Sequence, residues 1–228
     1  MTDLTKIDAI FFDMDGTLWD GVESYANGFN DFFEKHNIDR RLTKDEIYGF
    51  MGLEEDQYLE VTLPEFPYNQ RKSMYKDIIE FQYTCIKSEG GILFEGVKDG
   101  LAKLSQKYKL FIVSNCPEFT IQYFINWSGI KEYITDSMSH GMNFKPKYEN
   151  IKYLIEKYEL KSSVYVGDTD SDRKQSGLAQ IPFVFVDYGF GMAQNYDLRF
   201  DSFLNLTEYF VNQNSIHLYQ WHQYQTYK

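Results

Sequence analysis

The stretch from Asp8 to Asp20, Asp-Ala-Ile-Phe-Phe-Asp-Met-Asp-Gly-Thr-Leu-Trp-Asp, constrains the fold more than any other part of the chain. Its short apolar run at 10–12 is typical of a strand that is buried on both faces in a parallel sheet. We expect that strand to stop at Asp13. Two carboxylates and a glycine turn then follow directly.

Carboxylates two positions apart at a strand end can point to the same side and share one hard cation. Mg2+ is the expected ion, because it takes oxygen ligands and keeps several waters. Beside it, Asp13 can stay ionised and attack a phosphorus atom to give an aspartyl-phosphate. Asp15 can protonate the leaving oxygen and later deprotonate the attacking water. The residues therefore predict a phosphoryl-transfer site.

The turn itself can contribute to phosphate binding. Gly16 permits a tight turn, so that its N–H and the Thr17 hydroxyl could contact phosphate oxygens. Asp, Gly and Thr are also ordinary turn residues, and a strand that simply ends in a capped turn would look the same. The other strand ends decide between these interpretations.

Composition limits the class of protein. The 228 residues suffice for one large domain or a domain with an insertion, and 43% of them are hydrophobic. Lys+Arg 23 against Asp+Glu 34 gives a net charge of −11, which argues against nucleic-acid binding and favours a small substrate. Two distant cysteines, Cys85 and Cys116, indicate neither a disulfide framework nor a zinc site. Without a signal-peptide pattern or a membrane-length apolar run, we expect a soluble, cytoplasmic protein.

Two patterns divide the chain. Residues 21–91 carry apolar and aromatic residues at helical spacing, with a capping box at Thr43–Glu46, a long helix at 69–88 and a hinge at Gly90-Gly91. From residue 92 onward helices alternate with strands. We expect helices at 96–106, 118–127, 147–158 and 171–179, and strands at 109–114, 133–136, 163–167 and 183–187. This alternation predicts an α/β fold, a Rossmann-like, doubly wound parallel sheet with an inserted helical cap.

Ligands of such sheets bind at the carboxyl ends of the strands. Ser114 and Asn115 end one strand and can hold phosphate oxygens, although such a pair also starts ordinary turns. Lys145 precedes a proline at a helix entry, where a buried ammonium would neutralise charge; a solvated surface lysine is the alternative. Another strand is followed by Asp168-Thr-Asp-Ser-Asp172. These three aspartates exceed what one helix cap needs, and the excess indicates metal ligation.

Together these four polar segments resemble the motifs of the haloacid dehalogenase superfamily, most of whose members are phosphatases. The resemblance covers nearly the whole chain. It assigns the nucleophile to Asp13, the acid/base to Asp15, and the second and third motifs to Ser114 and Lys145. The Gly167–Asp172 stretch matches the fourth motif, GDxxxD, which makes Asp168 a direct Mg2+ ligand with Asp13 and the Asp15 carbonyl, while Asp172 holds the metal's waters.

The same resemblance implies a core domain of residues 1–20 and 92–228 and a cap domain of residues 21–91. Within the superfamily the layout is similar to the phosphoglycolate phosphatase and β-phosphoglucomutase-like group. We therefore expect a Mg2+-dependent phosphatase for a small phosphorylated metabolite, acting as a monomer or homodimer. A sugar-phosphate mutase and a non-catalytic phosphate-binding regulator are the alternatives. The loop 51–54 matches no known substrate signature, so the substrate stays open. The tail 213–228 could pack on the core or on a partner, and its sequence does not decide between them.

Overall fold

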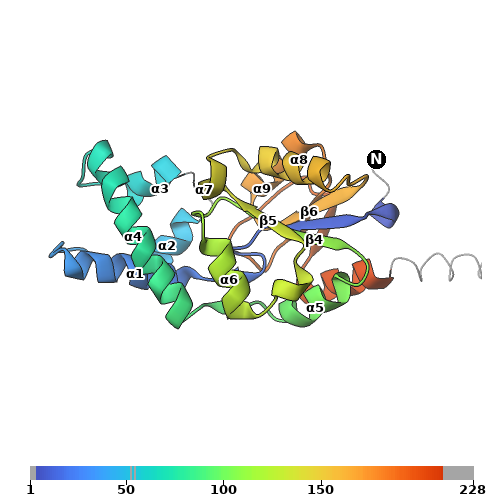
Figure 1. Cartoon of the computed structure of the whole chain (residues 1–228), viewed down its shortest axis with the longest axis horizontal. Coiled ribbons are helices and arrows are strands. Elements are labelled where there is room, and N and C mark those ends of the chain that lie inside the picture. The colour runs from blue at the N-terminus through green and yellow to red at the C-terminus, as the bar shows by residue number, and fades with distance from the viewer. Residues whose placement is uncertain (1–3, 52, 54, 213–228) are drawn as a thin grey trace, which may run out of the picture.

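The computed structural model describes residues 4–51, 53 and 55–212 of the chain. Its centre is a six-stranded sheet in the order β5-β4-β1-β6-β7-β8, and every neighbouring pair of strands is parallel (Figure 1). The strands are β1 (Ala9–Phe12), β4 (Lys109–Ser114), β5 (Asp136–Ser139), β6 (Ser163–Gly167), β7 (Phe183–Val186) and β8 (Leu198–Phe200). The expected α/β fold with a parallel sheet is confirmed.

Strand β1 lies in the interior of the sheet, which explains why its sequence is apolar on both faces. All four of its residues are fully buried. Ile10 and Phe12 pack into the hydrophobic cluster on one side of the sheet, while Ala9 and Phe11 pack into the cluster on the other side. The strand therefore holds the residue that follows it, Asp13, at the middle of the sheet edge.

Helices cover both faces of the sheet (Figure 1). Helices α5 (Val97–Leu104), α6 (Thr120–Ser128) and a helix at 203–212 supply apolar side chains to the cluster that contains Phe12. Helices α8 (Lys147–Lys157) and α9 (Asp170–Ala179) supply side chains to the cluster that contains Phe11. The sheet is thus the middle layer of three layers, as its two-sided burial requires.

Four helices follow β1 in sequence, before α5, and occupy one end of the molecule, at the left of Figure 1. They are α1 (Val22–Lys35), α2 (Lys44–Phe50), α3 (Glu55–Thr62) and α4 (Tyr68–Ser88). The expected long helix and the capping box are both present, since Thr43 accepts from the Glu46 N–H and the Glu46 carboxylate accepts from the Thr43 N–H. We name α1–α4 the helical insertion.

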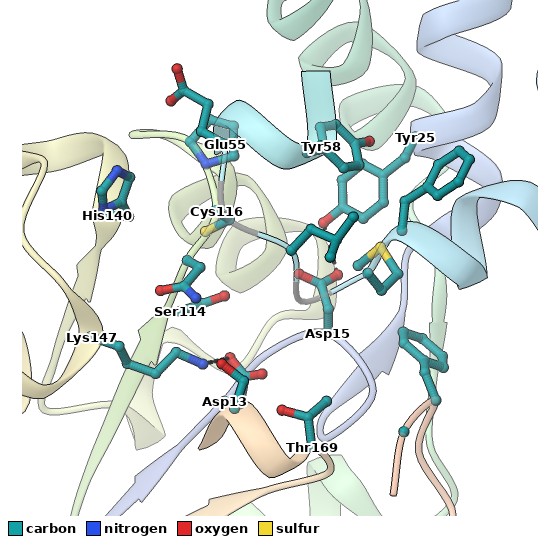
Figure 2. A pocket seen from close by; sticks show the side chains of 18 of the residues that line it. Asp13, Asp15, Tyr25, Glu55, Tyr58, Ser114, Cys116, His140, Lys147 and Thr169 are labelled. Atoms are coloured by element: carbon teal, nitrogen blue, oxygen red, sulfur yellow. Dashed lines mark hydrogen bonds and ion pairs between the residues drawn. The ribbon is translucent and has the colours of Figure 1, made fainter. Parts of the chain in front are cut away.

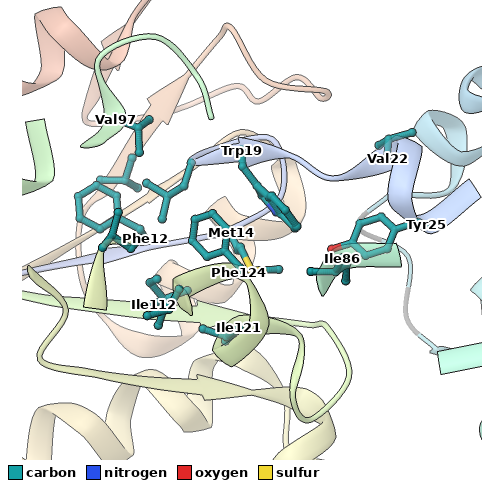
Figure 3. Packing of buried hydrophobic residues seen from close by; sticks show 14 of the residues in the cluster. Phe12, Met14, Trp19, Val22, Tyr25, Ile86, Val97, Ile112, Ile121 and Phe124 are labelled. Atoms are coloured by element: carbon teal, nitrogen blue, oxygen red, sulfur yellow. The ribbon is translucent and has the colours of Figure 1, made fainter. Parts of the chain in front are cut away.

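The two connections to the helical insertion are paired with each other. Strand β2 (Trp19–Asp20) enters it and β3 (Ile92–Leu93) leaves it, as a short antiparallel pair. The ring of Trp19 packs against Phe124 of the core at 4.8 Å and against Tyr25 of the insertion at 6.4 Å (Figure 3). This ring therefore joins the packing of the two parts.

Gly90 is required where the chain returns from the insertion. Its φ is +71°, and a Cβ built there would lie 1.9 Å from the Trp127 ring. The Ser24 hydroxyl also donates to the Gly90 carbonyl, which ties helix α1 to the return connection. A side chain at this position would push the connection off the core.

Some elements differ from the expectation. A strand was expected at 133–136, but residues Lys131–Tyr133 form a 3-10 turn and β5 begins only at Asp136. Strand β5 lies at the sheet edge and consists of Asp-Ser-Met-Ser, so it has no apolar run that would reveal it. Strand β8, the short helix α7 (His140–Asn143), the 3-10 turn Leu4–Lys6 and the helix at 203–212 were not expected.

The expectations for Gly52, Glu54 and the tail 213–228 lie outside the described residues. Within the described part of the chain, no helix combines the length and the apolar character that a membrane crossing needs.

Candidate active site

Three parallel strands deliver polar side chains to one cavity. Strand β1 is followed by Asp13, β4 ends at Ser114, and β6 is followed by Asp168. All three residues line a cavity of about 150 Å³ at the carboxyl edge of the sheet (Figure 2). The position agrees with the general location of ligands in open α/β sheets.

The turn after β1 is held together by hydrogen bonds to one backbone carbonyl oxygen. The N–H groups of Thr17, Leu18 and Trp19 all lie within 3.3 Å of the Met14 carbonyl oxygen and donate to it. Gly16 has φ +77°, and a Cβ there would lie 2.3 Å from Asp168 Oδ2. Only glycine lets this turn lie directly against the Asp168 carboxylate.

A buried lysine pairs with two of the acids. The Lys147 Nζ lies 3.0 Å from Asp13 Oδ1 and 2.6 Å from Asp172 Oδ1, and each of the three residues is at most 8% exposed. Burial disfavours the ammonium, but the charges of Asp13 and Asp172 raise the pKa of Lys147 well above its usual value. The lysine therefore stays charged beside Asp13.

The expectation that Lys145 supplies this ammonium is wrong. The Lys145 side chain is 59% exposed and pairs with Glu149 at 3.5 Å across one helical turn. Lys147 is the first residue of α8 and lies on the same helix face as the buried Asn150, Ile151 and Leu154. The periodicity i, i+3, i+4, i+7 directs Lys147 inward, whereas Lys145 precedes the helix and faces solvent.

Asp168 and Asp13 offer a place for a cation. The backbone N–H groups of Phe190 and Gly191 donate to Asp168 Oδ2 at 2.8 and 3.2 Å, while Asp168 Oδ1 is buried without a hydrogen-bond partner. Burial, together with the charges of Asp172 and Asp13, raises the pKa of Asp168 well above its usual value. One oxygen from each of Asp13, Asp168 and Asp172 lies within 4.8 Å of the others. A hard divalent cation fits this set of oxygens.

Asp172 is held by two partners. Its Oδ1 accepts from Lys147, and its Oδ2 accepts from the Thr169 hydroxyl at 2.6 Å in the capping box that begins α9. Asp172 thus caps helix α9 and also carries a carboxylate that faces the site, so both roles that the sequence suggested for this acidic stretch occur together. Asp172 faces the cation position with its orientation fixed by the helix.

Asp15 receives two hydrogen bonds from outside the turn. The Tyr25 hydroxyl donates to Asp15 Oδ1 at 2.8 Å, and the Trp19 indole donates to the same oxygen at 3.0 Å. Burial first, and the neighbouring charge of Asp13 second, raise the pKa of Asp15 to about 7. A carboxyl group with that pKa can both give and accept a proton near neutral pH.

The remaining sequence-predicted residues separate into two groups. Ser114, Asn115 and Cys116 line the cavity, and burial raises the pKa of the Cys116 thiol, which is therefore neutral. Gly16 and Thr17 do not line it, and the fully buried Thr17 Oγ1 has no hydrogen-bond partner. Phosphate binding by those two residues stays a prediction.

A model of the family described as haloacid dehalogenase-like hydrolase matches residues 10–186. The chain belongs to this family. The match spans the three acids, Lys147 and the whole helical insertion.

Solved structures show the same fold. A predicted phosphoglycolate phosphatase from Haemophilus somnus is 22% identical, with a TM-score of 0.78 over 90% of this chain and 98% of that one. A haloacid dehalogenase-like family protein from Streptococcus pneumoniae is 24% identical, with a TM-score of 0.76 over 91% and 100%. CbbY from Rhodobacter sphaeroides in complex with phosphate is 17% identical, with a TM-score of 0.73 over 88% and 96%. The comparison with curated protein sequences gives no significant match.

The helical insertion of this hydrolase completes the cavity from the side opposite the sheet. The Tyr25 hydroxyl points toward Asp15 in Figure 2, and Tyr58 lies on the same side of Asp15, farther into the insertion. The described insertion residues that line the cavity are Tyr25, Tyr48, Phe50, Met51, Leu53, Glu55, Tyr58, Tyr75 and Gln82. Met51 and Leu53 belong to the loop that the sequence singled out; Gly52 and Glu54 lie outside the described residues.

Several of these residues were missed by sequence reasoning, for different reasons. Lys147 was recoverable from the helix period given above. Tyr25, Tyr58 and Gln82 resemble other apolar or polar positions of amphipathic helices, and no local pattern distinguishes a residue that faces a cavity from one that faces a core. The contact of Phe190 with Asp168 joins residues 22 positions apart and has no local signal.

Proposed function

We propose that the protein is a Mg2+-dependent phosphatase that hydrolyses a small phosphorylated metabolite through an aspartyl-phosphate on Asp13. The observation that carries the proposal is the position of Asp13. Its carboxylate lines the cavity, next to a charged lysine on one side and the cation position at Asp168 on the other. That surrounding charge favours an anionic phosphoryl group beside an anionic nucleophile.

The metal would be held by the carboxylates of Asp13 and Asp168, with Asp172 behind them and the Asp15 carbonyl as the family resemblance implies. The unpartnered Oδ1 of Asp168 is the feature that best fits a bound cation. When bound, Mg2+ supplies positive charge to the phosphoryl oxygens and to the carboxylates that face them.

The chain's own residues can carry both chemical steps. In the first, an Asp13 oxygen bonds to phosphorus while the bond to the alcohol oxygen breaks, and Asp15 gives its proton to that alcohol. In the second, Asp15 takes a proton from water as the water oxygen bonds to phosphorus, which releases inorganic phosphate and frees Asp13. The hydrogen bonds from Tyr25 and Trp19 orient the Asp15 carboxyl for both transfers.

The phosphoryl group needs donors that do not react. The Lys147 ammonium, the Ser114 hydroxyl and the Asn115 amide come from residues that line the cavity with Asp13, and in this proposal they contact the phosphoryl oxygens. These neutral and cationic donors stabilise the charge that spreads over the phosphoryl oxygens in the transition state.

We also propose that the helical insertion acts as a cap domain of residues 21–91 on a core of residues 1–20 and 92–228. The paired strands β2 and β3 form the connection between the two. A cap that completes the cavity can exclude water from the first step and select the alcohol.

A screen of phosphorylated metabolites with Mg2+, read as released inorganic phosphate, tests the function. We expect release from at least one ester and from p-nitrophenyl phosphate, with loss of both in excess EDTA and in Asp13→Asn. Phosphate release that persists in EDTA or in Asp13→Asn would contradict the proposal. Transfer of the phosphoryl group to another position of the substrate, without release, would indicate a mutase instead.

A further inference from the structure

The cavity continues from Asp13 into the helical insertion, where rings form its wall. Tyr25, Tyr58 and Tyr75 are contributed by α1, α3 and α4, and Tyr58 and Tyr75 meet edge to face at 6.3 Å between ring centroids. Figure 2 shows Tyr25 and Tyr58 on the side of Asp15 away from Lys147. The part of a substrate beyond its phosphoryl group therefore meets aromatic faces.

That part of the cavity has no unpaired positive charge among the described residues. Lys147 is the only described lysine or arginine that lines the cavity, and its ammonium is already paired with Asp13 and Asp172. His140 lies across the cavity from the tyrosines in Figure 2, and its Nδ1 faces the Lys145 carbonyl at 3.1 Å. A carboxylate on the substrate would find no cationic partner in the aromatic part.

Among the residues that the structure describes, an ammonium group would find no free carboxylate there either. Glu55 is the acid that the insertion brings to the cavity, and its Oε1 lies 2.6 Å from Lys72 Nζ. The remaining acids, Asp13, Asp15, Asp168 and Asp172, belong to the phosphoryl end. The charges of the described residues in the aromatic part of the cavity are thus paired before any ligand enters.

One neutral polar group does lack a partner. Gln82 of α4 is 5% exposed and lines the cavity, and its Nε2 makes no hydrogen bond. Its amide lies beside the Tyr58 hydroxyl, and this contact lowers the pKa of Tyr58, which burial raises overall; the Gln82 Nε2 has no partner that meets strict hydrogen-bond geometry. Buried amide donors are nearly always paired, so a ligand oxygen is the expected partner of this one.

We infer that the alcohol released by this enzyme is uncharged, presents a ring or an apolar face to Tyr25, Tyr58 and Tyr75, and offers an oxygen to Gln82. The inference rests on the phosphatase function proposed above and specifies its substrate class. Phosphate esters of hydroxy acids, such as phosphoglycolate, are disfavoured, because their free carboxylate would be buried without a partner.

Benzyl phosphates that differ only at the para position test the charge requirement. We expect the para-hydroxymethyl ester to have the highest kcat/KM. The kcat/KM values of the para-carboxylate and para-aminomethyl esters should be lower by about a hundredfold or more. The same order is expected for 2-hydroxyethyl phosphate against phosphoglycolate. Equal or faster turnover of the carboxylate or aminomethyl ester would overturn the inference.

The role of Gln82 has its own test. In Gln82→Leu the preference for the para-hydroxymethyl over the para-methyl ester should fall about tenfold, the worth of one hydrogen bond to a buried donor. Gln70→Leu, an exposed position of the same helix α4, is the control and should keep the wild-type preference. An unchanged preference in Gln82→Leu would remove the residue from the alcohol site.

The two proposals fail in different ways. If no ester in the series, nor p-nitrophenyl phosphate, releases phosphate with Mg2+, the phosphatase function itself fails. If esters are hydrolysed but the charged ones are preferred, the function stands and the uncharged substrate class is wrong.

Discussion

The Lys147 ammonium lies between Asp13 and Asp172, 3.0 Å from an oxygen of one and 2.6 Å from an oxygen of the other. It thereby links the first residue of α8 to the end of β1 and to the first turn of α9. A charge buried this deeply costs free energy unless its partners are in place. The helix that begins at Lys147 is therefore oriented by the site as well as by its apolar face.

Lys147→Met should abolish most activity, while Lys145→Met should not. Removing the ammonium leaves Asp13 and Asp172 facing each other and takes away a donor to the phosphoryl group, so we expect kcat to fall about a hundredfold or more. Stability should fall by about 3 kcal/mol in the absence of metal, since two buried acids lose their partner. Steady-state kinetics and urea unfolding of both variants measure these effects.

Lys145→Met is the matched control, because its side chain is 59% exposed and pairs only with Glu149. Its activity should stay within about twofold of wild type. If Lys145→Met were inactive and Lys147→Met active, the cavity at Asp13 would not be the site of hydrolysis.

Asp13→Asn should retain the fold and lose turnover. The amide keeps the shape of the side chain but lacks the nucleophilic charge, so we expect kcat to fall about a thousandfold or more. Circular dichroism and a thermal scan should show a folded protein. A near wild-type rate in this variant would exclude an aspartyl-phosphate on Asp13.

Mg2+ should stabilise the free protein through Asp168. The acids that lie within 4.8 Å repel one another without a cation, so Mg2+ at about a hundred times its Kd should raise stability by about 2.7 kcal/mol and Tm by several degrees. Asp168→Asn should lose this shift, whereas Asp170→Asn, which is outside the cluster and pairs with Arg173, should keep it. Ca2+ should bind but inhibit, because its longer bonds and higher ligand number misplace the nucleophile.

The part of the site that sequence could predict is the part that one local segment encodes. Strand β1 and the turn after it are specified by consecutive residues, so Asp13, Asp15 and Gly16 could be placed from that segment alone. Asp168 was recoverable for the same reason. Each segment follows a buried strand, and strand ends of one parallel sheet meet at one edge.

Contacts between distant segments could not be predicted in this way. Tyr25 reaches Asp15 only because α1 packs against the turn that precedes it, and Gln82 faces the cavity only because α4 lies beside α1. The error at Lys145 has a different origin. The proline after Lys145 favours extended chain there, but only the helical period, which places Lys147 on the same face as Leu154, identifies the lysine that points inward.

Asp15→Asn should flatten the pH dependence of stability in the metal-free protein. The pKa of Asp15 is raised from 3.8 to about 7, so its contribution to stability is full below about pH 4 and is lost as the pH rises through 7. Between pH 5 and pH 8 wild type should lose of the order of 2 kcal/mol that Asp15→Asn does not lose. The amide oxygen can still accept from Tyr25 and Trp19, which makes this variant a near-isosteric control.

Urea unfolding in EDTA at the two pH values gives the comparison, and the difference between wild type and variant cancels the titration of other groups. Identical pH profiles for the two proteins would mean that the Asp15 carboxyl titrates as it does in the unfolded chain. The acid/base assignment would then lose its support from the pKa.

Gly90→Ala should disturb the connection between the helical insertion and the core. The new Cβ would need a φ of +71° and would lie 1.9 Å from the Trp127 ring, so we expect a loss of about 2 kcal/mol or more in stability. Gly177→Ala in α9 is the control. Apart from its chain neighbours and the backbone of its own helix, no described atom lies within 4 Å of a Cβ at Gly177, and alanine should stabilise that helix by about 0.5–1 kcal/mol.

The kinetic consequence distinguishes a structural connection from one that sets substrate choice. If the insertion must sit correctly on the core to complete the alcohol site, Gly90→Ala should lower kcat/KM for the best natural ester more than kcat/KM for p-nitrophenyl phosphate. The reactive leaving group of p-nitrophenyl phosphate depends less on contacts with the insertion. An equal fall for both esters, in protein that is fully folded at the assay temperature, would assign selectivity to the core loops rather than to the placement of α1–α4.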